Sequence, residues 1–184
     1  QYANVDFIYV EAWDSGYPNY NNLKLLFDDV RQYGSKASVV AAYMNRDKTS
    51  GYFNEASVRL ANATIFASGI GHIELGDGDE MLRTEYFPEN TVKMSDSLRS
   101  AMRTYYDFLV GYENLLRDKT VSASHTATIS GVTTSTNGSA GKVWVISKKT
   151  LGYNIIHLIN LCNNTSTAWR DNLGTYPVPT TLNN

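Results

Sequence analysis

Carboxylate side chains stand where apolar segments end in the first half of this sequence. The run at 7–10 stops at Glu11, and Glu74 and Asp77 follow a later apolar run. Desolvating a carboxylate at the end of a buried segment costs free energy unless an opposite charge or hydrogen bonds compensate for it. Two such groups can serve as acid/base and nucleophile at a glycosidic bond, whereas several can hold Mg²⁺. The residue types therefore indicate a glycosidase or a metal-dependent enzyme.

Aromatic residues close to these acids favour the glycosidase. The sequence has 13 tyrosines and 3 tryptophans, and Trp13 and Tyr43 follow directly after apolar runs. Tyrosine and tryptophan rings combine an apolar face with a polar edge, which suits a sugar-binding cleft. A tyrosine-rich core and surface remains the alternative interpretation of this composition.

Each candidate residue also has a structural interpretation. A glutamate at the end of a buried strand can belong to a structural ion pair instead of a catalytic site. Asp77 and Asp79 lie in a glycine-rich stretch, which is typical of solvated turns. His72 lies within an apolar run, where a histidine is typically packed and hydrogen-bonded.

Composition and charge exclude several other classes of protein. The net charge of −2 and pI near 5.9 give no basic surface for nucleic acid or an anionic membrane. No apolar run reaches the length of about 18 residues that suggests a membrane span. The single cysteine, Cys162, and three widely spaced histidines do not form a zinc motif. We predict no metal site and no cofactor.

The candidate residues lie on alternating strands and helices. Apolar runs predict strands at residues 6–11, 36–44 and 71–80. Helical spacing between them predicts one helix capped by Asn21 or Asn22 and ended by Gly34, and a second that Asn54 caps and Gly69 ends. Short strand–helix–strand connections imply a parallel sheet with both faces covered. The carboxylates should then lie together at the carboxyl ends of the strands.

The second half of the sequence changes character near residue 119. Ser95 caps a predicted helix from Asp96 to Arg117. Its apolar stripe consists of Leu98, Met102, Tyr105, Leu109, Tyr112 and Leu116. From Thr120 the composition is rich in serine, threonine and glycine, which predicts antiparallel β structure. Asn137 and Gly138 give a hairpin signal, and a loop is the alternative interpretation of this pair. We expect an α/β domain over 1–119 and a β-rich domain over 120–184, of the β-sandwich type and incomplete.

The α/β part predicts either a small doubly wound domain or a portion of a (β/α)8 barrel. Three strand–helix units are too few to close a barrel, and an isolated sheet would keep exposed edges. The sequence opens at Gln1 without a methionine and enters a strand-like run within a few residues. These features favour the C-terminal portion of a (β/α)8 TIM barrel over 1–119, followed by the beginning of an antiparallel β domain.

Three phrases of the sequence resemble glycoside hydrolase family 66, which contains endo-dextranases and cycloisomaltooligosaccharide glucanotransferases. They read "DFIYVEAW", "HIELGDGDEMLRTEYFPEN" and "MSDSLRSAMRTYYDFLVGYENLLRD" in this order, and the resemblance spans about residues 5 to 118. It implies a retaining mechanism on α-1,6-glucan in a (β/α)8 barrel followed by a β domain. The family's acid/base glutamate matches Glu11. Its nucleophilic aspartate has no counterpart before Glu11, which implies that this residue and the first half of the barrel lie upstream. The chain by itself is then expected to be inactive.

Position suggests supporting roles for five further residues. Trp13 and Tyr43 are predicted to stack on glucose rings. Asp14, Glu74 and Asp77 complete the predicted substrate-binding set, through hydrogen bonds to sugar hydroxyls. The expected partner is therefore an α-glucan polysaccharide or oligosaccharide.

The resemblance leaves the reaction and the location open to alternatives. The resemblance implies that glucanotransferases of the family have a carbohydrate-binding module inserted after the seventh barrel strand. In this sequence the corresponding loop, "NRDKTSGYF" (45–53), is too short to contain such a module. Hydrolysis of dextran is therefore favoured. The alternatives are transglycosylation to cyclic isomaltooligosaccharides and a non-catalytic glucan-binding fragment. Because a polymer is too large to import, we expect an extracellular, cell-surface or periplasmic protein.

Overall fold

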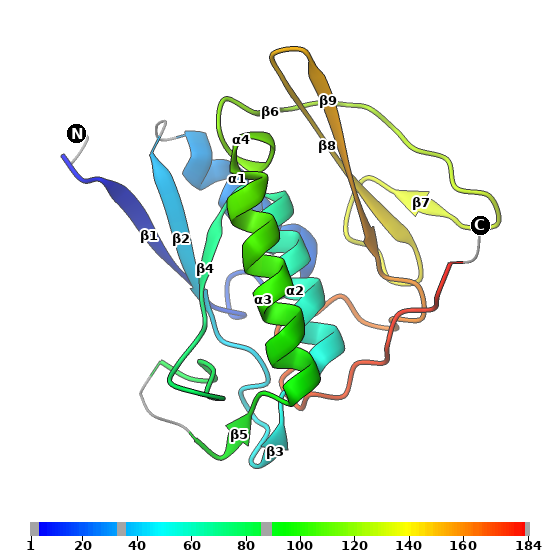
Figure 1. Ribbon diagram of the computed structural model, residues 1–184. Coiled ribbons are helices and arrows are strands. Elements are labelled where there is room, and N and C mark those ends of the chain that lie inside the picture. The colour runs from blue at the N-terminus through cyan, green and yellow to red at the C-terminus, as the bar shows by residue number, and fades with distance from the viewer. Residues whose placement is uncertain (1–3, 33–35, 86–89, 183–184) are drawn as a thin grey trace.

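The computed structural model describes residues 4–32, 36–85 and 90–182, and its main elements form layers (Figure 1). Helices α2 and α3 lie between a three-stranded sheet and a long β-hairpin. The sheet consists of β1 (Phe7–Ala12), β2 (Ala37–Ala42) and β4 (Gly71–Ile73). The longer helices are α1 (Tyr20–Gln32), α2 (Glu55–Ala67) and α3 (Asp96–Gly111), and the hairpin consists of β8 (Val143–Thr150) and β9 (Tyr153–Asn160). The short elements are β3 (Gly51–Tyr52), β5 (Val92–Lys93), α4 (Glu113–Leu116), β6 (Val121–Ser122) and β7 (Thr134–Ser135).

The sheet has the order β1-β2-β4, and both of its strand pairs are parallel. This confirms the predicted α/β alternation, because a parallel neighbour requires a crossover such as α1 or α2. Within the described residues, three strands make an open sheet and not a closed barrel. The (β/α)8 barrel therefore stays a prediction.

The two faces of this sheet differ in what covers them. Ala12 of β1 and Val40 of β2 belong to the main hydrophobic core on the side of the helices, and the partly buried Val10 packs against it. On the opposite face Phe7 is 54% exposed and Tyr9 is 51% exposed. The prediction that both faces are covered is therefore wrong for the described part of the chain. Side chains along a strand alternate between the two faces of the sheet. A strand with apolar residues on its open face therefore has the same continuous apolar sequence as a strand that is covered on both faces.

The predicted helix starts are confirmed at two of three positions. The side chains of Asn54 and Ser95 accept hydrogen bonds from the backbone amides of Ser57 and Leu98, both at 3.1 Å. At α1 the cap is Asn19 instead of Asn21 or Asn22, and its side chain accepts from the Asn22 amide at 2.9 Å. The predicted end of this helix at Gly34 lies outside the described residues.

Two predicted elements are shorter than expected. The long helix stops at Gly111, because Tyr112 leaves helical geometry (φ −118°, ψ 19°), and α4 follows as a separate turn. Tyr112 is 51% exposed and is not part of the apolar stripe. The strand expected over 71–80 ends at Ile73. Beyond it the chain turns back on itself, with the Gly76 amide donating to the Glu80 carbonyl at 2.9 Å. None of the helices in the described ranges is long and apolar enough to cross a membrane.

The β-rich part is mostly antiparallel, as predicted, although its hairpin lies elsewhere. β8 pairs antiparallel with β6 and β9, and parallel with β7. Asn137 and Gly138 lie between the parallel strands β7 and β8, so they belong to a loop, the second interpretation, and not to a hairpin turn. The tight turn joins Thr150 to Tyr153, where Gly152 adopts φ +82°. Glycine reaches this left-handed region without the steric cost of a Cβ atom.

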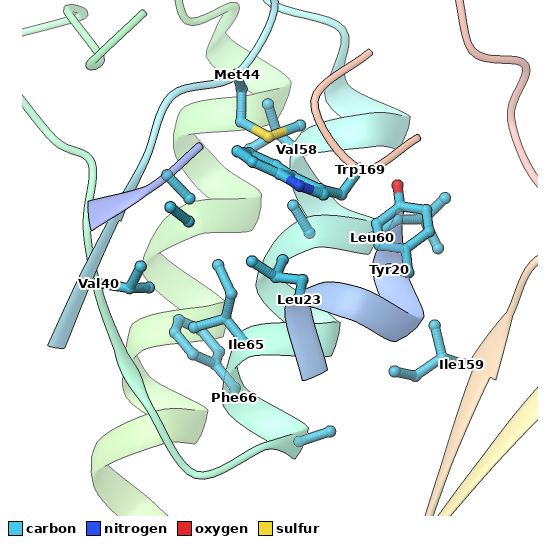
Figure 2. Packing of buried hydrophobic residues seen from close by; sticks show 14 of the residues in the cluster. Tyr20, Leu23, Val40, Met44, Val58, Leu60, Ile65, Phe66, Ile159 and Trp169 are labelled. Carbon is cyan, nitrogen blue, oxygen red and sulfur yellow. The ribbon is translucent and has the colours of Figure 1, made fainter. Parts of the chain in front are cut away.

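One hydrophobic core includes residues from both predicted domains. Trp169, which follows the hairpin, is 0% exposed and lies alongside Met44 and Val58 (Figure 2). Trp144 of β8 and Ile159 of β9 belong to the same cluster. The β-rich part is therefore packed on the α/β part, and the domain boundary near residue 119 stays a prediction.

Lys148 on the hairpin and Arg31 on α1 both donate to carbonyls at or near the ends of helices, and we call these two side chains the cation junction. The Lys148 amine donates to the Leu116 carbonyl at 2.6 Å, and Lys148 is 3% exposed. The Arg31 guanidinium donates to the carbonyls of Ser68 at 3.1 Å and Thr120 at 3.0 Å. Carbonyl groups at helix C-termini favour cations, so this arrangement satisfies backbone acceptors that the helices leave open.

The cation junction predicts a stability that rises with pH. Burial, and then the nearby Arg31, lower the pKa of Lys148 from 10.5 to about 7. Between pH 7 and 9 the unfolded chain therefore binds a proton that the folded protein has lost, and raising the pH favours folding. We expect the denaturant midpoint to increase over this range, and Lys148→Met to flatten the increase.

Lys149→Met is the matched control, because Lys149 is the exposed neighbour on the same strand. It should keep the pH dependence of the parent. An equal increase in the parent and in Lys148→Met would contradict this account.

Candidate active site

Glu11 lies near the carboxyl end of β1, on the open face of the sheet. Its Oε1 atom accepts a hydrogen bond from the Tyr43 hydroxyl and a longer one, at 3.5 Å, from the Tyr9 hydroxyl. Glu11 itself is exposed, so solvent or a ligand can reach the carboxylate. Among the described residues, the hydrogen bonds to this carboxylate fall on Oε1 and none falls on Oε2.

Strand geometry brings these three side chains together. Tyr9 precedes Glu11 by two residues on β1, so both side chains point to the same face. Glu11 is paired with Ala41 of β2, and Tyr43 follows Ala41 by two residues on that face. The cluster therefore depends on the parallel register of β1 and β2.

Tyr43 is held in place by packing around its ring. It is 4% exposed and packs with Ala41, Leu82 and Trp13. The Trp13 and Tyr43 ring centroids are 5.6 Å apart. Burial, with the hydrogen bond to Glu11, raises the pKa of Tyr43 above its ordinary value, so its hydroxyl remains a neutral donor. A ring this buried offers no face to a sugar, which argues against the predicted stacking of Tyr43 on glucose. Trp13 is only half-buried, and stacking of its ring on glucose stays a prediction.

Arg170 reaches this end of the sheet from the segment that follows the hairpin. Its Nε donates to the Tyr43 carbonyl at 2.9 Å and its Nη1 donates to Asp14 Oδ1 at 2.7 Å. The guanidinium carbon is 5.7 Å from the ring centroids of Trp13 and Trp169. Asp14, predicted to bind substrate, is therefore engaged in an ion pair with a buried arginine.

Sequence reasoning missed Arg170. The residue lies in the phrase "AWRDN" (168–172), in a stretch without strand or helix periodicity. The available signal was a tryptophan, an arginine and an aspartate grouped within a serine- and threonine-rich segment. That grouping does not say which distant residue the arginine pairs with.

Glu74 lies on the other side of the sheet from Glu11. It is 1% exposed, accepts a hydrogen bond from the Tyr106 hydroxyl at 3.0 Å, and lies 3.2 Å from His72 Nδ1. The same His72 nitrogen lies 2.7 Å from Asn62 Oδ1. These contacts make His72 the packed, hydrogen-bonded histidine predicted as one interpretation. They also place Glu74 where substrate does not reach it, so its predicted contact with sugar hydroxyls is not supported.

Asp77 lies in the exposed turn that follows β4. Its carbonyl accepts from the Glu80 amide at 2.9 Å, and Gly78 adopts φ +59°. Asp79 of the same turn pairs with Lys93 at 3.0 Å. This geometry agrees with the solvated-turn interpretation, and a contact of Asp77 with substrate stays a prediction.

Comparison with known proteins gives consistent matches. The family model described as Glycosyl hydrolase family 66 matches residues 1–184. Two cycloisomaltooligosaccharide glucanotransferases of Niallia circulans are 41% identical over 177 residues (93% of this chain, 17% of the relative) and 48% identical over 127 residues (67% and 13%). A dextranase of Streptococcus salivarius is 25% identical over 199 residues, covering 86% of this chain and 24% of the relative.

A solved structure shares the fold. It is that of a Paenibacillus sp. cycloisomaltooligosaccharide glucanotransferase complexed with cycloisomaltoheptaose, with a TM-score of 0.89 at 23% sequence identity. The match covers 97% of this chain and 43% of that chain. At this identity the likeness concerns the fold alone. The chain spans 17% of the length of the first glucanotransferase.

Proposed function

Because the chain belongs to glycosyl hydrolase family 66, we propose that it contributes the general acid/base, Glu11, to a protein that cleaves α-1,6-glucan. The family predicted from three sequence phrases is thereby confirmed. The observation that carries the proposal is the position of Glu11. It is exposed at the carboxyl end of a parallel strand, with Oε1 held by Tyr43 and, among the described residues, no hydrogen bond on Oε2.

Glu11 would act as an acid in the first step. Its proton moves to the glycosidic oxygen while the bond from that oxygen to the anomeric carbon breaks, and a carboxylate nucleophile forms a bond to the same carbon. In a retaining enzyme this nucleophile lies about 5 to 5.5 Å from the acid/base. We assign it to an aspartate outside the residues described for this chain.

Glu11 would act as a base in the second step. It takes a proton from water or from a sugar hydroxyl, whose oxygen attacks the anomeric carbon and releases the nucleophile. The Tyr43 hydrogen bond holds one oxygen of the carboxylate throughout, so the other oxygen exchanges the proton at a constant position. Keeping the reacting group in one orientation supplies part of the rate acceleration.

The open face beside Glu11 suits a glucan chain. Trp13 is half-buried against Tyr43, and the uncovered part of its ring provides an apolar surface for a glucose unit. The named activities of the relatives, dextranase and cycloisomaltooligosaccharide glucanotransferase, support an α-1,6-linked substrate. A polymeric substrate in turn supports a location outside the cytoplasm, on the cell surface or beyond it.

Two acceptors compete in the second step, and different observations favour each. Hydrolysis is supported by the dextranase activity named for one relative. The short connection between β2 and α2 does not separate the two reactions, because a glucanotransferase aligns with 93% of this chain over only 177 residues, which leaves no room for an inserted module. Transfer to a sugar hydroxyl is supported by identities of 41% and 48% to glucanotransferases, against 25% to the dextranase. We keep hydrolysis as the first candidate and cyclisation as the second.

The products formed from dextran by the full-length protein test this proposal. Linear isomaltooligosaccharides, with one new reducing end for each cleaved bond, are expected for hydrolysis. Products lighter by one water and without a reducing end would instead establish cyclisation. Binding in a dextran pull-down without any product would contradict the enzymatic proposal and favour the glucan-binding alternative.

A further inference from the structure

We infer that Arg170 is a positioning residue for Glu11: it fixes the backbone at Tyr43 and the turn at Trp13–Asp14, and thereby holds the Tyr43 hydroxyl on the catalytic carboxylate. The inference rests on the proposed role of Glu11 and extends it to a segment that follows the β-hairpin. Arg170 does not touch Glu11 or the reacting atoms, so its role is indirect.

The contacts of Arg170 lead to both neighbours of the Glu11–Tyr43 pair. Its Nε donates to the Tyr43 carbonyl at 2.9 Å, at the position where β2 has just ended. Its Nη1 donates to Asp14 Oδ1 at 2.7 Å, three residues after Glu11. One side chain therefore ties together the carboxyl ends of β1 and β2, which carry the acid/base and its hydrogen-bond donor.

The backbone of the same segment adds further anchors. The Asn45 amide donates to the Arg170 carbonyl at 2.9 Å, and the Asn45 side chain donates to the Asp171 carbonyl at 2.7 Å. Trp169 is 0% exposed in the core. The segment is thus fixed on both sides of Arg170, and the guanidinium has a rigid base from which to act.

The shape of the guanidinium explains why an arginine is needed here. Its planar fork presents several donors in fixed directions, whereas a lysine amine is a point charge on a flexible stem. Arg170 is 1% exposed and lies between the rings of Trp13 and Trp169, both at 5.7 Å. A charge this buried requires partners, and Asp14 supplies the opposite charge. Two other charged side chains lie near Arg170: Arg46 repels the guanidinium and Glu85 attracts it.

Removing Arg170 should change the position of Glu11 indirectly, because it moves Tyr43. Without it the Tyr43 carbonyl and the Trp13 ring lose a common support, and the Tyr43 hydroxyl no longer stays on Oε1. The Glu11 carboxylate is then no longer held in one orientation toward the glycosidic oxygen, and holding a reacting group in place supplies part of the rate acceleration. We therefore expect weaker acid catalysis.

The test compares Arg170→Met and Arg170→Lys in the full-length protein, with two substrates. For Arg170→Met we expect kcat/KM on dextran to fall by about tenfold or more, since misplacing a catalytic group has effects of this size. On a dinitrophenyl isomaltoside, whose leaving group needs no proton, the loss should be about threefold or less. Arg170→Lys keeps the charge and should restore part of the dextran activity.

Arg31→Met is the matched control. Like Arg170, Arg31 is an arginine that donates to backbone carbonyls, but it is only partly buried and lies at the cation junction. Arg31→Met should lower thermal stability without changing the ratio of kcat/KM on the two substrates. If Arg170→Met does not fold, Asp14→Asn removes one end of the bridge at a side chain that is 35% exposed, and should act in the same direction.

Two results separate this inference from the proposed function. If the variants at Arg170 and Asp14 lose activity equally on both substrates, Arg170 is only structural, and the inference fails while the role of Glu11 stands. If Glu11→Gln keeps normal turnover of dextran, the proposed function fails and the inference with it.

Discussion

Replacing Glu11 by glutamine in the full-length protein should reduce the turnover of dextran by about 10²- to 10⁴-fold, the range that general acid–base catalysis contributes. Glutamine has the same shape and still accepts a hydrogen bond from the Tyr43 hydroxyl, so the fold should be kept. What it lacks is a proton to give to the departing glycosidic oxygen. The measurement is kcat/KM from the release of reducing sugar.

The dependence on the leaving group identifies the step that fails. The dinitrophenolate group of a dinitrophenyl isomaltoside departs without protonation. With this substrate, the first step, formation of the glycosyl–enzyme, should therefore be nearly unaffected in Glu11→Gln, and only the second step, its breakdown, should be slow. Glu113→Gln is the control, because Glu113 is an exposed glutamate on α4 that pairs with Arg117. It should keep the parent's activity on both substrates. Normal turnover of dextran by Glu11→Gln would remove Glu11 from the catalytic role.

Replacing Trp169 by alanine should lower the free energy of unfolding by about 3–5 kcal/mol, as expected for a large aromatic residue removed from a core. Trp169 is 0% exposed, and Figure 2 shows it beside Met44, Val58 and Tyr20. Its indole Nε1 also donates to the Tyr17 carbonyl. The substitution therefore leaves a cavity, an unpaired carbonyl and a segment no longer held to the sheet.

Leu173→Ala is the control for this prediction. Leu173 lies four residues further along the same segment and is 63% exposed, so its removal should change stability by about 0.5 kcal/mol or less. Denaturant unfolding of the two variants beside the parent gives the comparison. Equal midpoints for Trp169→Ala and Leu173→Ala would show that the segment does not contribute to the core.

Short-range patterns in the sequence predicted the elements that depend on local chemistry. Asn54 and Ser95 were identified as helix caps because each is a short polar residue just before a helical apolar pattern, and both make the expected hydrogen bond. Alternating strands and helices predicted the parallel pairs β1–β2 and β2–β4. The end of the first apolar run placed Glu11 at the carboxyl end of its strand. Three phrases were enough to identify the family.

The sequence did not determine which face of the sheet is open. Glu11 and Glu74 were treated alike, because each is a glutamate that closes an apolar run. Tertiary packing separates them: α3 brings the Tyr106 hydroxyl to Glu74 on the covered face, whereas Glu11 lies on the exposed one. The alternation of a strand tells which side chains share a face, but apolar residues on both faces leave the covered side undetermined.

The tertiary structure also decided what surrounds Glu11, the proposed acid/base. Tyr43 was predicted to stack on sugar, yet the register of β1 and β2 turns its hydroxyl to Glu11. Arg170 is 156 residues from Asp14 in sequence, and no local pattern connects them. Amphipathic periods and the caps at Asn54 and Ser95 arise from neighbours along the chain, so the sequence by itself determined them. Contacts at this separation form only when the whole chain has folded, so the residues that orient Glu11 were visible only in the tertiary structure.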